Sequence, residues 1–205
     1  METVKISEHS FPPGRIKITQ ALKSLLAQKD FQTIKIAEIA ETAGVNEALI
    51  YKYFKNKRDL LYQMIVDHLE YCQKEMIEEI NRQKGAFLKL ETFICTFFDL
   101  YNKDRIFAKI MLFELRNSSD FYLSTPYRII QSIYDLCLSL IKEGISDGTF
   151  RKDMNVSFIR QHIIGSVEQF CMNSIISDRD IQSKEMTGYL IDLLTNGITR
   201  KTDFH

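Results

Sequence analysis

The sequence contains few residues that would interrupt a helix or cross-link the chain. Its 205 residues include three prolines, eight glycines, four cysteines and no tryptophan. The scarcity of proline and glycine predicts a chain that is helical almost throughout. The cysteines are far apart in the chain: Cys72, Cys95, Cys137 and Cys171. Because no C-x-x-C pair occurs and each lies in an apolar helical stretch, we expect buried free thiols in a cytoplasmic protein.

Other absences argue against whole classes of protein. The histidines show no metal-ligand spacing: His9, His68, His162 and His205. There is no run of eighteen apolar residues, and no apolar stretch follows basic residues at the N-terminus, so neither a membrane span nor secretion is expected. No Ser/His/Asp constellation or glycine-rich phosphate loop occurs. The sequence therefore predicts a protein that is not an enzyme and holds no metal or cofactor.

Charge is balanced over the whole chain but not along it. There are 27 basic and 27 acidic residues in total, yet residues 1–58 hold ten basic and six acidic ones, and residues 59–205 hold seventeen and twenty-one. Any affinity for nucleic acid is therefore expected near the N-terminus. The length and the hydrophobic content of 45% suit one small and one medium domain.

A helix, a tight turn and a second short helix are predicted within about residues 35–54. The first helix has one apolar face with i, i+3, i+4, i+7 spacing: Ile36, Ile39, Ala40 and Ala43. Gly44 stands where a left-handed residue ends a helix, and Asn46 can cap the next one. In that second helix, Leu49 or Ile50 and Phe54 are expected to face inward. The outward residues would be Glu47, Ala48, Tyr51 and Lys52. This arrangement is a helix-turn-helix, which places its second helix in the major groove of DNA.

The run from Arg15 to about Ile65 resembles the DNA-binding head of the TetR family of bacterial repressors. The matching positions occur in order: the Ala21–Leu25 stripe, Phe31, Ile36-x-x-Ile39-Ala40-x-x-Ala43-Gly44-Val45, Tyr51-x-Tyr53-Phe54 and Lys57-x-x-Leu60-Leu61. The resemblance implies a head of three helices followed by a long fourth. The residues expected to contact DNA are Lys35, Asn46, Glu47, Leu49, Tyr51, Lys52, Tyr53 and Lys57. Tyr51, Tyr53 and Lys57 would hold phosphates, and residues 46–52 would face base edges.

The head departs from the family pattern at three places. Ile34 and Lys35 stand where the family usually has a Ser or Thr cap, which leaves Thr33, water or a phosphate to cap the first helix of the motif. Ala48 replaces a small glycine early in the recognition helix. Glu47 has two readings: it can stabilise the helix dipole, or it can accept a hydrogen bond from a cytosine amino group.

The rest of the chain is predicted to form a helical body, giving an all-α protein of about nine helices. We expect a DNA-binding domain at residues 12–72 and a ligand-binding and dimerisation domain at residues 73–205. One long helix, from Leu60 to about Ile80, would link the head to the body. Two aromatic helices would follow near residues 90–101 and 106–115. A central helix at about 126–143 carries apolar residues in nearly every direction, so it is expected to be buried. The last two helices are predicted at about 156–176 and 183–199.

The TetR resemblance implies that these last two helices form a four-helix bundle with those of a second subunit. We therefore expect a homodimer through residues 156–199. Gly165 and Gly197 lie inside or at the end of these helices, where a close approach of two helices would justify glycine. A dimer also suits DNA reading, because a single short recognition helix reads too few bases.

The aromatic helices and the central helix could form either a closed core or a long ligand tunnel. A second resemblance lies in Phe113–Ser118, Glu143-Gly144-Ile145, Gly148-x-Phe150-Arg151-x-Asp153 and Arg160-Gln161-x-x-x-Gly165. These stretches are similar to TetR-type regulators of fatty-acid degradation, which release DNA on binding long-chain acyl-CoA. The residues expected to bind such an effector are Phe93, Phe97, Arg105, Phe107, Lys109, Met111, Arg116, Ile133, Tyr134 and Phe170.

The expected function is that of a repressor released from a palindromic double-stranded DNA operator by a small hydrophobic effector. The effector would favour a spacing of the two heads that no longer fits successive major grooves. Two alternatives stay open at this point. The same fold could sense a planar aromatic drug or another apolar molecule, or the chain could be a helical interaction module that does not bind DNA.

Overall fold

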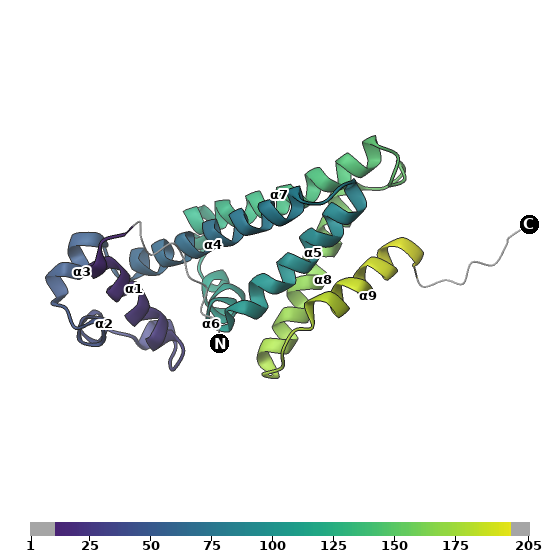
Figure 1. Ribbon diagram of the computed structural model, residues 1–205. Helices are drawn as coiled ribbons and strands as arrows, with labels where there is room; N and C mark the ends of the chain where they lie inside the picture. The colour runs from purple at the N-terminus through teal and green to yellow at the C-terminus, as the bar shows by residue number, and fades with distance from the viewer. Residues whose placement is uncertain (1–10, 198–205) are drawn as a thin grey trace, which may run out of the picture. The chain divides into compact units, whose positions relative to one another are not determined.

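The computed structural model describes residues 11–197 and contains nine α-helices and no strand in that range (Figure 1). The predicted all-α class is therefore confirmed. His9, His205 and the expected end of the last helix at residues 198–199 lie outside the described residues. The first four helices are α1 (Pro13–Leu26), α2 (Ile36–Ala43), α3 (Glu47–Tyr53) and α4 (Lys57–Asn81), with a 3-10 turn, η2 (Phe31–Thr33), before α2.

Five further α-helices follow α4, and irregular helical turns lie between α6 and α7. The α-helices are α5 (Ala86–Lys103), α6 (Arg105–Lys109), α7 (Thr125–Ser146), α8 (Val156–Ile176) and α9 (Ser183–Asn196). The turns are a π-helical segment, η3 (Ile110–Glu114), and two 3-10 segments, η4 (Leu115–Asn117) and η5 (Ser119–Leu123).

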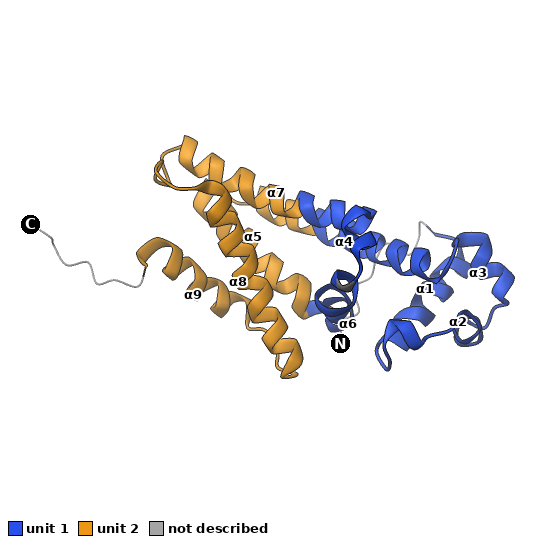
Figure 2. Ribbon diagram, turned by 180° about the vertical axis from the view of Figure 1, so that it is seen from behind, with its two compact units in different colours: residues 1–74, 103–132 blue, residues 75–102, 133–205 orange. Residues whose placement is uncertain are grey.

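The chain divides into two compact units (Figure 2). Unit 1 comprises residues 1–74 and 103–132, and unit 2 comprises residues 75–102 and 133–205. Helices α4 and α7 each contribute residues to both units. In unit 1, α1 packs on α2 and α3 around a buried apolar centre. Its fully buried members include Ile18, Leu22, Ile39, Ile50, Phe54 and Leu60.

Unit 2 is built on the apolar face of α5. Its Lys89 forms an ion pair with Glu143 of α7 (2.6 Å), and its Phe98 ring lies 6.5 Å from that of Phe170 on α8. At the end of α5, the Asn102 amide exchanges two hydrogen bonds with the backbone of Ile181 (3.0 and 3.1 Å). These contacts hold α7, α8 and the start of α9 around one aromatic helix.

Two expectations about the body are wrong. Helix α7 is not buried on all sides, because its polar residues recur every third or fourth position and share one exposed face: Arg128, Ser132, Asp135, Ser139 and Lys142. The segment at 106–115 is not one regular helix. It is the short α6, capped by Asp104 Oδ1, which accepts a hydrogen bond from the Phe107 N–H (3.2 Å), followed by the π-helical turn. Apolar spacing does not distinguish a π-turn from an α-turn over so few residues.

The two glycines expected at a helix contact differ in their roles. Gly197 has a φ of 67° and ends α9, so it terminates the helix. Gly165 lies inside α8 on an exposed face, where an added Cβ would meet nothing within 4 Å. The cysteines are free thiols, as predicted, although only Cys137 and Cys171 are fully buried. Burial raises the pKa of each of these two thiols to about 12.

Candidate DNA-binding surface and effector region

The turn of the helix-turn-helix is fixed by Gly44 and Asn46. Gly44 adopts a left-handed conformation (φ 64°, ψ 38°), and the Val45 N–H donates to the Ala40 carbonyl (3.0 Å), which ends α2 at Ala43. Asn46 Oδ1 then accepts a hydrogen bond from the Leu49 N–H (2.9 Å) and starts α3. The predicted turn and both helix ends are confirmed.

Helix α3 presents one face to the interior of unit 1 and the other to solvent. Ile50 and Phe54, just after the helix, are buried. The exposed residues are the ones that were expected outside: Glu47, Ala48, Tyr51 and Lys52. A shallow hollow runs beside them and is lined by Gly44, Val45, Asn46, Ala48, Leu49 and Lys52. This surface is therefore formed by one continuous stretch of chain.

Leu49 and Tyr53 are less available for DNA than the outward residues, because both pack against the first turn of α1. An added Cβ on Gly14 would lie 3.0 Å from Leu49 Cδ2 and 3.4 Å from the Tyr53 ring. Glycine at this position lets the two helices approach closely. The contacts of Leu49 and Tyr53 with DNA stay predictions.

Among the described residues, no side chain accepts a hydrogen bond from the first N–H groups of α2. Lys35 occupies the cap position and is exposed, and Thr33 Oγ1 donates instead to the Asp30 carbonyl (2.8 Å). Thr33 therefore does not cap α2, and water or a phosphate remains of the predicted caps. The first amides of α2 are thus open to either acceptor.

Many of the basic side chains of the head are paired within unit 1. Arg15 forms a largely buried ion pair with Asp67 (2.7 Å), and Arg58 pairs with Asp120 (2.8 Å). Two more lysines, Lys23 and Lys29, form ion pairs with Asp104 and Glu38 respectively. The Lys57 ammonium donates to three backbone carbonyls. Among residues 11–58, four basic side chains form neither an ion pair nor a hydrogen bond: those of Lys17, Lys35, Lys52 and Lys55.

Five of the expected effector residues lie in or near α6 in unit 1, and two of them, Phe107 and Met111, are buried. Phe107 is 2% exposed, and its ring stacks on the His68 ring with centroids 3.7 Å apart and planes within 8°. Arg105 is half-buried, whereas Lys109 and Arg116 are exposed. Met111, in the π-helical turn, is also buried. The sequence did not predict His68 as a member of this cluster, and its Nδ1 has no hydrogen-bond partner among residues 11–197.

Unit 2 contains the other expected effector residues. Phe93, Phe97 and Ile133 are buried, and the Phe97 ring lies 5.7 Å from Phe93 and 6.3 Å from Tyr134. Phe93, Phe97 and Tyr134 therefore share one aromatic core. Phe170 differs, since 47% of it is exposed on α8 beside Gln169 and Gly165. Apolar residues occupy both the inner and the outer face of α8, so spacing alone does not show that Phe170 lies on the outer one. Its contact with an effector stays a prediction.

The half-buried carboxylate of Glu168 borders this aromatic core. Tyr134 OH donates to Glu168 Oε1 (2.6 Å), and Tyr101 OH lies 3.5 Å from the same oxygen. The sequence offers one signal for this group, a glutamate flanked by apolar residues on α8. Its two tyrosine partners come from α5 and α7 and are not apparent from the sequence. Residues 11–197 contain no cluster that could hold a metal ion, and no helix there is long and apolar enough to span a membrane.

Comparison with known proteins matches both parts of the chain to families. Residues 18–64 match bacterial regulatory proteins of the tetR family, and residues 55–197 match the C-terminal region of YsiA-like proteins. The chain belongs to the TetR family. This TetR-family protein is thus a DNA-binding transcriptional regulator and not an enzyme.

Relatives and solved structures agree with this assignment. The fatty acid metabolism regulator protein of Bacillus subtilis is 26% identical over 189 residues, which cover 92% of this chain and 97% of that protein. The repressor KstR2 of Mycolicibacterium smegmatis is 20% identical over 73% of each chain. FadR from Bacillus subtilis, solved in complex with stearoyl-CoA, aligns with a TM-score of 0.82 and 25% identity over 90% of this chain and 99% of that one. FadR from Bacillus halodurans (TM-score 0.83, 23% identity, 92% and 98% covered) shares the fold.

Proposed function

We propose that this TetR-family protein is a homodimeric cytoplasmic repressor that a long-chain acyl-CoA releases from a palindromic operator. The observation that carries the proposal is the similarity over 90% of the chain to a FadR structure in complex with stearoyl-CoA. Residues 12–72 would form the DNA-binding domain, and residues 73–205 would bind the effector and the second subunit. Family membership argues against an interaction module without DNA binding.

The outward face of α3 is the surface that we assign to the operator. The residues that would face bases are Asn46, Glu47, Leu49 and Lys52. The phosphate backbone would be contacted by Lys35, Tyr51 and Tyr53. Tyr51 is 55% exposed, so its hydroxyl can reach a phosphate. Lys35 lies at the uncapped N-terminus of α2, where backbone N–H groups also favour an anion.

The face of α8 and α9 that points to solvent is the surface that we assign to the second subunit. Large apolar side chains are exposed there: Phe158, Phe170, Ile176, Tyr189 and Leu193. An added Cβ on Gly165 or Gly188 would meet nothing within 4 Å, so a partner helix could approach closely at both positions. An exposed apolar surface of this kind is typical of a protein interface.

In unit 2, the acyl chain would contact the apolar region around Phe93, Phe97, Ile133 and Tyr134. Phe107 and Met111 of unit 1 stay predicted effector residues. Each buried methylene contributes about 0.8 kcal/mol, so affinity should rise with chain length until the space is full. Arg105, Lys109 and Arg116 are the cations that we assign to the nucleotide head. Phe170, being exposed, suits the dimer surface better.

The test is release of a fluorescent operator by acyl-CoA thioesters of increasing chain length, with free fatty acids and a planar aromatic drug as controls. Long chains should release the operator and short chains should not. Met111→Trp should shorten the longest effective chain and leave DNA affinity without effector unchanged. Release by the aromatic drug alone would favour the second candidate effector, and an equal response to all chain lengths would contradict the acyl-CoA proposal.

A further inference from the structure

Lys57, the first residue of α4, uses its whole hydrogen-bonding capacity inside the head. Its Nζ donates to the carbonyl oxygens of Phe31 (2.9 Å), Gln32 (3.2 Å) and Ile34 (2.6 Å). An ammonium group has three N–H donors, and here each has an acceptor. The same Nζ lies 4.5 Å from the centroid of the Phe31 ring. A phosphate could bind this ammonium only by displacing a carbonyl.

The three carbonyls belong to the connection that leads from α1 into α2. Phe31 and Gln32 lie in η2, and Ile34 is two residues before the first residue of α2. Phe31 and Ile34 are themselves buried, so the connection is anchored on both the apolar and the polar side. Lys57 thus links the start of α4 to the point at which the helix-turn-helix begins.

From this geometry we propose that Lys57 is a positioning residue for operator recognition and does not contact phosphate. It holds η2 against α4 and so sets where α2 starts. Helix α3 follows α2 through the Gly44 turn, whose conformation is fixed, and a shift of α2 therefore shifts the recognition helix. A phosphate contact and a positioning contact have different consequences for binding, and these can be separated by experiment.

Loss of a phosphate contact weakens operator and non-specific DNA alike and lowers the slope of log K against log salt by about 0.9 per contact. Loss of positioning weakens operator binding only, because non-specific binding needs the charges of the head but not the alignment of α3 with base edges. The ratio of the two affinities is the quantity that distinguishes these roles. A loss of stability alone does not change this ratio in a protein that is fully folded during the measurement.

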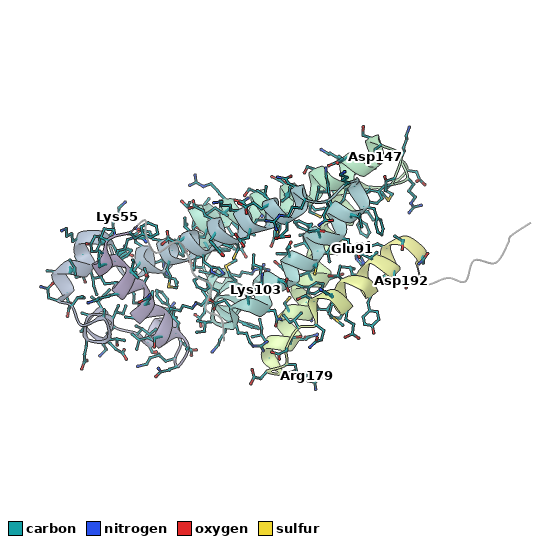
Figure 3. All side chains as sticks on the ribbon, viewed as in Figure 1. Lys55, Glu91, Lys103, Asp147, Arg179 and Asp192 are labelled. Atoms are coloured by element: carbon teal, nitrogen blue, oxygen red, sulfur yellow. The ribbon has the colours of Figure 1, made fainter. Side chains whose placement is uncertain are left out.

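The experiment compares Lys57→Met with Lys55→Met in the full-length protein. Lys55 lies two residues away on the surface of the turn between α3 and α4 and forms no ion pair among residues 11–197 (Figure 3). The DNA probes are an operator selected by the wild-type protein from random duplexes and a scrambled duplex of equal length. Binding is measured across a salt series, well below the unfolding temperature of each variant, and circular dichroism confirms that each is folded.

Lys57→Met should reduce the affinity ratio of operator to scrambled DNA by about tenfold, the effect of a single mismatched base pair, with an unchanged salt slope. Lys55→Met should leave the ratio unchanged. Lys57→Gln, which keeps two N–H donors without the charge, should recover part of the ratio and remains usable if Lys57→Met does not fold. An unchanged ratio with a smaller salt slope in either Lys57 variant would overturn the proposal.

Discussion

The ring of His68 is buried in unit 1, flat against Phe107, and Lys23 and Asp104 lie nearby. Burial is the main cause that lowers the pKa of His68 from 6.5 to about 4; Asp104 opposes the shift and Lys23 adds to it. Within residues 11–197, the His68 ring has one hydrogen-bonding partner, the Cys72 thiol, whose sulfur lies 3.5 Å from Nε2. His68 is therefore neutral in the folded protein at pH 7.

Acidification should destabilise the protein through His68. Between pH 6.5 and pH 4 the unfolded chain binds a proton at this residue that the folded chain does not, so the stability present above pH 6.5 is lost as the pH falls towards 4. The loss should be roughly 3 kcal/mol in the free energy of unfolding. Urea unfolding at several pH values measures it. His68→Phe should show a shallower pH dependence over this range, and an equal dependence in both proteins would refute the assignment.

At the recognition helix, single residues should determine which bases are preferred. Glu47 and Lys52 are exposed at the two ends of the outward face of α3. Replacing either by alanine should change the discrimination at particular base pairs by roughly 1–3 kcal/mol if a well-placed base contact is lost. Competition among operators with single substitutions measures this. Lys17→Ala on α1 is the control, and altered base preference in that variant would mean that the assigned face is wrong.

At the scale of elements, the end of α7 depends on one glycine. An added Cβ on Gly144 would lie 2.1 Å from Cδ2 of Phe150, whose N–H donates to the Gly144 carbonyl (2.7 Å). Gly144→Ala should therefore force the ring aside and reduce stability by about 1–3 kcal/mol. Thermal unfolding measures the change. Combining it with Phe150→Ala should remove most of the added cost, and strictly additive effects would show that the two groups do not collide.

Helix ends were the part of the fold that the sequence predicted best. The end of α2 and the start of α3 depend on Gly44, Asn46 and atoms within five residues of them, so local chemistry determines them. The ion pairs of the head were not predicted, because Arg15 and Asp67 are 52 positions apart and Lys23 and Asp104 are 81 apart. Pairings at such distances depend on how the helices pack.

The exposed faces of α7 and α8 were not predicted for a similar reason. Spacing identified α7 and α8 as helices, but it did not show which side faces solvent. On α7 a polar stripe with i, i+3 and i+4 spacing marks the exposed side. On α8, apolar residues lie on two faces, one buried within unit 2 and one exposed. Their spacing in one sequence does not distinguish the two faces. Whether residues 12–72 act as a separate domain stays a prediction.

At the scale of the whole molecule, the exposed apolar face of α8 and α9 should decide the oligomeric state. Tyr189 and Leu193 are 62% and 40% exposed, whereas Leu190 is 3% exposed and packs within its own subunit. Replacing Tyr189 and Leu193 by glutamate should give monomers, as measured by sedimentation. Leu123→Glu, at an apolar residue of unit 1 that is 81% exposed, should leave the dimer intact. A dimer that persists in the double variant would place the interface elsewhere.

The salt dependence of DNA binding should reflect unpaired lysines and not the formal charge of the head. Lys17, Lys35, Lys52 and Lys55 are the basic side chains of residues 11–58 without an ion pair or hydrogen bond. If each contacts one phosphate in both subunits of a dimer, log K should fall against log salt with a slope of about −7. Titrations from low to moderate salt measure it. A slope near −18, as if all ten basic residues of each N-terminal segment took part, would contradict this count.

The proposed DNA-reading face on α3 belongs to unit 1 and the proposed dimer face on α8 and α9 belongs to unit 2, and this division has a genetic consequence. A chain whose recognition helix is damaged keeps its assembly surface, so it would still pair with normal chains in the same cell. Each mixed dimer would carry one working head and would fail to hold a two-part operator. Alleles that alter Glu47 or Lys52 should therefore be dominant over the normal allele. Alleles that also place glutamate at Tyr189 and Leu193 should be recessive.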